Sequence, residues 1–297
     1  MKEAQKNVSE VKKGYDLEII CSDKKKLYSS RAILAASSEV FNGLLYNGMK
    51  ESYEKQICLP TVNSSVMKII LEYAYTGSIK ESLTKDNIIE VYSAADYFQL
   101  LDLRDFVIKT VKNVLKSKYK YNYSPELLSR AVETMILSED NILLNLLIEA
   151  VSTTPLNTIK FGRLSINALQ YLLSCTHKKK KPFATPEYDV FRYSAILVSK
   201  GISNNTSKSL TKFLPTLKQL KQFKNSIKTD SKLIPNRQRI AKELEALVKF
   251  IDFRRIGEQI ITDVIEPLEI TPTVAVYRSN KTLDTTRGIP MKYYISS

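Results

Sequence analysis

The residue types that could perform chemistry are few and poorly spaced for it. The single histidine, His177, lies two residues after Cys175 and beside a run of lysines, so a histidine-dependent nucleophilic site would have to be built there. Three scattered cysteines and one histidine cannot supply the paired ligand spacings of a zinc finger. We therefore predict no catalytic residue, no metal site and no cofactor, and we expect the chain not to be an enzyme.

One glycine-containing segment has the outline of a phosphate-binding loop. Gly43 and Gly48 flank four residues, but Met49 stands where a lysine would have to reach the phosphates. We interpret both glycines as marking the end of a helix. The acidic pair Glu139 and Asp140 is expected at a helix start, where the helix dipole favours carboxylates without any chemistry.

Composition places the chain among globular proteins. Its 297 residues, 43% of them hydrophobic, are enough for two ordinary domains. We expect no membrane span, because no run reaches the roughly 18 to 20 apolar residues that one needs. The start, Met1 to Lys13, is charged and predicts no secretion signal. Widely spaced cysteines predict no disulfide framework, so the cytoplasm is the expected compartment and the nucleus the alternative.

The formal net charge of +14 raises the question of a nucleic acid or an acidic partner. The excess is diffuse, with dense runs only at 24–26 and 178–181. Neither run has interleaved aromatic residues that would stack on bases, so solvated loops are favoured over a nucleic acid site.

Hydrophobic periodicity places strands and helices over the first hundred residues. Residues 15–21 alternate as a strand, a turn leads into a short strand at 27–28, and 54–59 supplies a third strand. Helices are expected between and after these strands. The predicted helix caps are Ser30, the pair Ser37–Ser38, Asn63 or Ser64, and Thr84, and Gly77 is the predicted helix end.

Only helical patterns follow the tyrosine-rich segment 118–123. Ser124, as an N-cap before Pro125, is expected to open a second, helical region. We expect an irregular polar stretch at 203–209 and a loose tail over 271–297. The helices predicted from periodicity are 125–138, 140–153, 165–174, 186–200, 211–226, 237–250 and 254–265.

An ordered set of segments resembles the BTB (POZ) domain: Asp16–Ile20, Tyr28–Phe41, Met49–Ser52 and Tyr73–Gly77. The later segments Phe161–Ser165, Leu169–Leu173 and Pro186–Phe191 are similar to the BACK domain of Kelch-like adaptors. The resemblance implies an α+β fold, a small sheet plus helices, followed by an all-α BACK domain. The implied boundaries are a short N-terminal arm at 1–14, the BTB/POZ domain at 15–118, a BACK-like helical domain at 124–267 and a C-terminal tail or linker at 268–297.

The same resemblance implies a substrate adaptor of a cullin-RING ubiquitin ligase, whose BTB domain binds the third cullin. Met49, Lys50 and Glu51 match the family's hydrophobic-x-Glu cullin motif. An exposed methionine is an adaptable apolar anchor, and a nearby carboxylate fixes orientation through hydrogen bonds. The alternative is that Met49 covers the edge of the domain while Glu51 is solvated.

Asp16 and Arg31 fall where the family keeps a charged pair at its dimer interface, so a homodimer through the BTB domain is implied. The chain has no recognisable Kelch repeats, MATH domain or zinc fingers, and its substrate protein is not identified by sequence. Either the helical region and the tail read the substrate, or the tail is a linker that leads into another domain in longer relatives. The rival hypotheses are a self-associating BTB protein in transcription, a competitor of longer BTB adaptors, and, as a remainder, an unrecognised enzyme.

Overall fold

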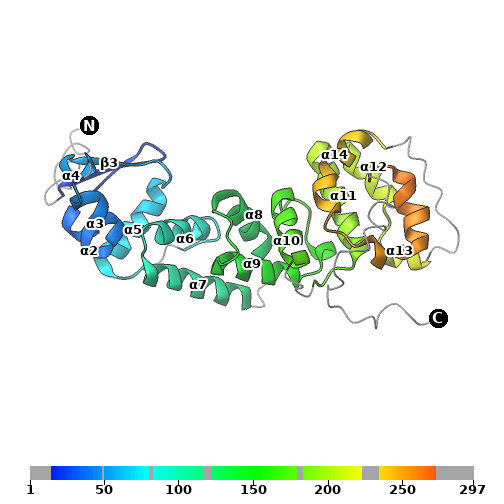
Figure 1. Ribbon diagram of the computed structural model, residues 1–297, viewed down its shortest axis with the longest axis horizontal. Coiled ribbons are helices and arrows are strands. Elements are labelled where there is room, and N and C mark those ends of the chain that lie inside the picture. The colour runs from blue at the N-terminus through cyan, green and yellow to red at the C-terminus, as the bar shows by residue number, and fades with distance from the viewer. Residues whose placement is uncertain are drawn as a thin grey trace, which may run out of the picture. The chain divides into compact units, whose positions relative to one another are not determined.

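The computed structural model divides the chain into two compact units, Met1–Asn122 and Tyr123–Ser297 (Figure 1). It describes residues 15–48, 50–79, 83–116, 122–178, 183–222 and 234–271. Within these ranges, no helix combines the length and the apolarity needed to cross a lipid bilayer.

The first unit contains a three-stranded sheet in the order β2-β1-β3. The strands are β1 (Leu17–Cys21), β2 (Lys26–Ser29) and β3 (Gln56–Leu59). Ile19 lies opposite Leu27 in the antiparallel β1–β2 pair and opposite Ile57 in the parallel β1–β3 pair. Every second residue of β1 is buried, as its alternating sequence predicts.

Helices complete this α+β unit. They are α2 (Arg31–Ser37), α3 (Glu39–Tyr46), α4 (Lys50–Tyr53), α5 (Ser64–Thr76), α6 (Ile88–Tyr97) and α7 (Leu101–Lys116). The first three form the crossover that a parallel β1–β3 pair requires. Phe41 of α3 stacks on Phe98 with ring centroids 4.2 Å apart, and the buried Ser38 Oγ donates to the Phe98 carbonyl at 2.5 Å. The core thus ties the crossover to the end of α6.

Three of the predicted helix signals are confirmed. Ser38 accepts from the Phe41 N–H, Asn63 accepts from the Val66 N–H, and Gly77 ends α5 with a left-handed φ of 67°. Each of these signals is local, since the capping group and the backbone it satisfies lie within a few residues.

Three cap predictions differ from the structure in part or in full. Ser124 is the first residue of the helix Ser124–Thr134, and Tyr123 holds the N-cap position. Ser30 holds the N-cap position of α2, but its side chain makes no capping hydrogen bond, and Asp16 accepts from the Arg31 N–H instead.

Asn87, and not Thr84, is the N-cap residue of α6. In the turn before the helix, the Thr84 Oγ1 accepts from the Asp86 N–H at 3.3 Å and the Thr84 carbonyl accepts from the Asn87 and Ile88 N–H groups. At α2 a distant carboxylate satisfies the backbone that a local hydroxyl was expected to satisfy, whereas at α6 the hydroxyl bonds to the turn that precedes the helix.

The turn after β1 is tied to the start of α5. The Ser64 Oγ donates to Asp23 Oδ2 at 2.7 Å, the Ser64 N–H donates to Oδ1 at 3.1 Å, and the Lys25 ammonium lies 3.3 Å from Oδ2. These contacts, led by the Ser64 hydroxyl, lower the pKa of Asp23 to about 2.

Within its described part, the second unit contains helices joined by turns and loops, and no strand. Its helices are α8 (Ser124–Thr134), α9 (Ile142–Ser152), α10 (Ile166–Lys178), α11 (Glu187–Ile202), α12 (Asn204–Phe213), α13 (Leu217–Gln222), α14 (Arg237–Val248) and the short α15 (Glu258–Ile260). Helix α11 is central: it is buried along most of its length and packs against α10, α12 and α14. Such burial explains why its sequence is apolar on several sides.

The structure corrects the sequence boundaries around α12 to α15. Residues 203–209 are not irregular: Ser203 accepts from the Thr206 N–H and starts α12. The single helix expected over 211–226 is interrupted, because Pro215 lacks the N–H needed to continue α12 and α13 begins only at Leu217. The helix expected over 254–265 is instead a 3₁₀ turn at Phe253–Arg255 followed by α15, a π turn at Ile261–Ile265 and a second 3₁₀ turn at Glu266–Leu268.

Candidate functional site

The predicted cullin-binding segment lies between α3 and β3. Met49 is outside the described residues, and Lys50 and Glu51 begin the one-turn helix α4. Lys50 is exposed and pairs with Glu54 at 3.4 Å, one helical turn later. Within the described part of the chain, the half-buried Glu51 carboxylate has no hydrogen bond or ion pair. It therefore has acceptor capacity left for a partner.

Two aromatic residues flank this segment and were not singled out from the sequence. Tyr53 of α4 is 84% exposed and Tyr46 at the end of α3 is 54% exposed. Exposed aromatic rings are characteristic of protein interfaces, because they bring large contact area with few rotatable bonds. No sequence signal marks them, since tyrosine is also found buried in this chain, as at Tyr193. We call Tyr46, Lys50, Glu51 and Tyr53 the α4 surface.

Arg31 holds the α4 surface in place from α2. Its guanidinium donates to the Glu51 carbonyl at 3.3 and 3.4 Å, to the Ser52 carbonyl at 3.3 Å and to the Leu45 carbonyl at 3.4 Å. These are carbonyls from the ends of α3 and α4, which leave acceptors unsatisfied and carry partial negative charge. One cation thus bonds to carbonyls of both α3 and α4.

Asp16 and Arg31 touch each other, but not as a side-chain ion pair. The Asp16 carboxylate accepts from the Arg31 backbone N–H at 2.8 Å, at the start of α2, while the guanidinium points to the carbonyls described above. The Tyr75 hydroxyl also accepts from the Ser30 N–H at 2.9 Å. The predicted dimer residues therefore have contacts within one chain, and their role between subunits stays a prediction.

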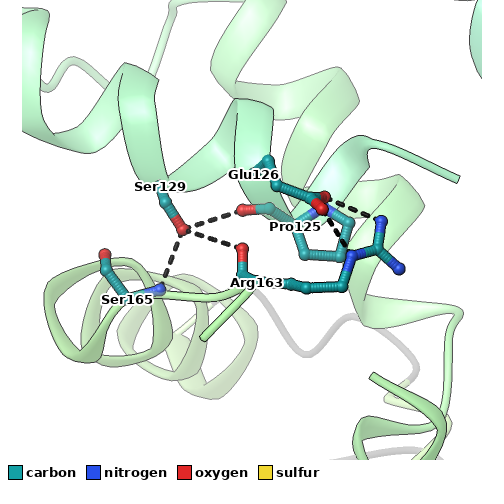
Figure 2. Close-up of polar contacts among 5 residues, drawn as sticks. All are labelled: Pro125, Glu126, Ser129, Arg163 and Ser165. Atoms are coloured by element: carbon teal, nitrogen blue, oxygen red, sulfur yellow. Dashed lines mark hydrogen bonds and ion pairs between the residues drawn. The ribbon is translucent and has the colours of Figure 1, made fainter. Parts of the chain in front are cut away.

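In the second unit, the segment that resembles the BACK domain is fastened to α8 (Figure 2). The Arg163 guanidinium forms a bidentate ion pair with the Glu126 carboxylate. The Ser129 Oγ donates to the Pro125 carbonyl at 2.8 Å and accepts from the Ser165 N–H at 2.9 Å. The ion pair holds the loop against α8, and the Ser129 hydroxyl satisfies a backbone N–H at the start of α10. We therefore assign these contacts a structural role.

The same loop also contacts α11. The Phe161 ring stacks on Tyr193 at a centroid distance of 4.9 Å, and the Lys200 ammonium donates to the Phe161 carbonyl at 3.3 Å. Burial raises the pKa of Tyr193. Gly162 has a φ of 96°, a conformation that favours glycine, so the turn between these contacts depends on that residue.

The residues first considered for nucleophilic or acid–base chemistry all belong to the second unit. Cys175 is buried in α10, and the His177 ring lies edge-on to Phe250 at 6.1 Å. Glu139 and Asp140 precede α9, whose start is capped by Asn141. The described residues contain no cluster of three or more side chains arranged to hold a metal ion.

Comparison with known proteins assigns the first unit. The family model for the BTB/POZ domain matches residues 6–115. Human Kelch-like protein 6 is 38% identical over 87 residues, which are 29% of this chain and 14% of that protein. BTB/POZ domain-containing protein 9 of Drosophila melanogaster is 38% identical over 89 residues, 30% of this chain and 12% of that protein. The solved BTB domain of human gigaxonin is 27% identical, with a TM-score of 0.29, over 35% of this chain and 84% of that chain.

The N-terminal unit therefore carries a BTB/POZ domain, a class of protein-interaction module. The chain covers only about a seventh of the length of Kelch-like protein 6. The residues that match the family model lie within the first unit. The BACK resemblance of the second unit stays a prediction, as do the roles of Lys50, Glu51, Asp16 and Arg31.

Proposed function

We propose that this protein is a substrate adaptor of a cullin-RING ubiquitin ligase, in which the α4 surface binds the third cullin. The observation that carries the proposal is the arrangement of α4 itself. This one-turn helix is bonded through its backbone carbonyls to the Arg31 guanidinium. It carries the exposed Tyr53 and a Glu51 carboxylate that has no partner in the described part of the chain. Met49, directly before α4, is the proposed apolar anchor.

The chemistry of this surface suits a protein partner. An exposed aromatic ring and a flexible methionine supply the apolar contact that most interface free energy comes from, and a carboxylate at its edge fixes register through hydrogen bonds. Because Arg31 fixes the backbone at Glu51 and Ser52, little conformational entropy remains to be lost on binding.

The proposal has two further parts. The helical second unit is a BACK domain that spaces the assembly and contacts the substrate protein, and the BTB domain forms a homodimer to which Asp16 and Arg31 contribute. Asp16 and Arg31 lie together at the start of α2, and Tyr15 next to them is 41% exposed. Such a partly exposed charged pair would orient two subunits more than it would strengthen their association.

Capture of the purified third cullin on the immobilised full chain tests the proposal. The variant Met49→Ala/Glu51→Ala is compared with the wild type and with Lys68→Ala, an exposed position on α5. We expect wild type and Lys68→Ala to retain the cullin equally and the double variant to lose at least about 90% of it, since interface anchors are worth about 1.4 kcal/mol or more. Equal capture by all three would remove the role given to the α4 surface.

A further inference from the structure

A long segment of the second unit is basic and free of acidic residues. Between Asp189 and Asp230 the sequence has no aspartate or glutamate, yet it contains eight lysines and arginines. Within its described part, Lys208 and Lys212 lie one turn apart on α12, and Lys218 and Lys221 lie one turn apart on α13. All four side chains are exposed, and only residues 214–216 separate the two helices that carry them. We call these four lysines the lysine face.

The lysine face lacks the compensation that other cations in this unit have. Arg239 pairs with Glu243 at 2.9 Å, and Arg254 pairs with Asp252 at 2.8 Å. Among the residues that the structure describes, none of the four lysines has an acidic partner. Like charges one turn apart destabilise a helix, and no ion pair among the described residues offsets this cost.

The helix dipole explains part of the pattern and leaves part unexplained. Lys212 and Lys221 lie in the last turns of their helices, where cations are favourable. Lys208 is in the middle of α12 and Lys218 is in the first turn of α13, where the dipole disfavours a cation. The opposite side of α12 packs inward through the buried Thr206 and Leu210, so all the charge is turned to solvent.

We propose that the lysine face is a docking surface for an acidic segment of a partner protein. This inference rests on the proposed adaptor function, within which that partner is the substrate. Lysine is a point charge with three donors and no preferred planar geometry, which suits flexible runs of glutamate and aspartate. Because the contacts lie in water, the binding is expected to be weak per contact, additive over several lysines and sensitive to salt.

A protein partner fits these residues better than a nucleic acid does. Arg192, the one arginine in the acid-free segment, donates to the buried Leu214 carbonyl at 2.8 Å and does not belong to the lysine face. Bidentate phosphate and base contacts are chiefly made by arginine, and single strands stack on exposed aromatic rings. In the described residues beyond Ile142, no large apolar or aromatic side chain is strongly exposed, so no stacking surface accompanies the lysines.

The test uses the full chain and a fluorescent peptide of alternating glutamate and serine, with a glutamine-for-glutamate peptide as the neutral probe. Fluorescence anisotropy gives the dissociation constant for wild type and for two variants of equal charge change. One variant carries Lys→Gln at Lys208, Lys212, Lys218 and Lys221, and the other carries Lys→Gln at Lys68, Lys109, Lys112 and Lys160, which are exposed elsewhere. Melting curves confirm that both variants stay folded.

We expect the lysine-face variant to weaken binding of the acidic peptide about tenfold or more, because each exposed contact contributes about a twofold change. The control variant should change it less than about threefold through net charge alone. Equal weakening by both variants would overturn the inference, and so would failure of the wild type to bind the acidic peptide more tightly than the neutral one. A DNA oligonucleotide of the same charge that binds more tightly and displaces the peptide would overturn it in favour of nucleic acid.

Capture of the third cullin distinguishes a failure of this inference from a failure of the adaptor function on which it rests. The lysine-face variant should capture the third cullin as well as the wild type does, because its substitutions leave the α4 surface intact. Peptide binding that is lost only in the lysine-face variant, together with no cullin capture by the wild type, would refute the adaptor proposal and keep the acidic-peptide site. Cullin capture without selective peptide binding would refute the lysine face alone.

Discussion

Replacement of Arg31 by alanine tests whether α2 positions the α4 surface. The guanidinium makes four contacts to three carbonyls, all between 3.3 and 3.4 Å, which is at the long end for hydrogen bonds. A charge-assisted hydrogen bond contributes about 1.5 to 3 kcal/mol when it is well formed. Because Arg31 is half-buried and its contacts are long, we expect a total of about 2 kcal/mol for the set.

Amide hydrogen exchange measures this effect locally. A loss of about 2 kcal/mol corresponds to roughly 30-fold faster exchange where local opening governs the rate. We expect this in peptides that cover Lys50–Lys55 of Arg31→Ala, and a smaller increase in Arg31→Lys, because one ammonium cannot reach all three carbonyls. Peptides from α9 in the other unit, and all peptides of Lys68→Ala, serve as controls.

The same variants separate two roles for Arg31. If it positions α4, Arg31→Ala weakens cullin capture while the mass in solution stays that of the wild type. Unchanged exchange over Lys50–Lys55 in Arg31→Ala, together with a halved mass relative to a dimeric wild type, would refute the positioning role. Arg31 would then belong to the subunit interface that the sequence resemblance predicts.

The remaining predictions concern hydrogen bonds between distant segments. The pKa of Asp23 is lowered to about 2, chiefly by the Ser64 hydroxyl. Its carboxylate therefore stabilises the fold fully above its ordinary pKa of 3.8, and this stabilisation is lost as the pH falls through about 2. The melting temperature of wild type should exceed that of Asp23→Asn near neutral pH, and the two should converge by about pH 2. Ser38→Ala leaves the buried Phe98 carbonyl without its donor and should lower the free energy of unfolding by about 1 to 3 kcal/mol in denaturant titrations; a change under about 0.5 kcal/mol would mean that water replaces the hydroxyl. Ser129→Ala should speed amide exchange at the start of α10 and leave the first unit unchanged, whereas unchanged exchange at Ser165 would show that the bond carries no stability.

Local signals predicted much of the fold. Alternation identified β1, and the caps at Ser38 and Asn63 and the end at Gly77 were read correctly because cap and helix are adjacent in sequence. The cap of α2 was not predictable in this way, because Asp16 lies at the start of β1, fifteen residues before the N–H it accepts from. Helix α12 was missed because only Thr206 and Leu210 of it are buried, which gives too few apolar positions for a clear period.

The candidate site was predictable only in part. The sequence motif placed Lys50 and Glu51, and the structure puts both on α4. The contacts of Arg31 with backbone carbonyls leave no mark in the sequence, since every residue has a carbonyl. The exposure of Tyr53 likewise cannot be predicted from residue type, since Tyr193 is buried.

The most direct test of the adaptor proposal is light scattering of the full chain mixed with purified third cullin after size-exclusion chromatography. We predict a stable complex whose mass equals one cullin per BTB chain, and its loss in Met49→Ala/Glu51→Ala while Lys68→Ala behaves as wild type. Elution of the two proteins as separate species at concentrations of about 10 μM would contradict the proposal, because a specific interface of ordinary size binds well below that level.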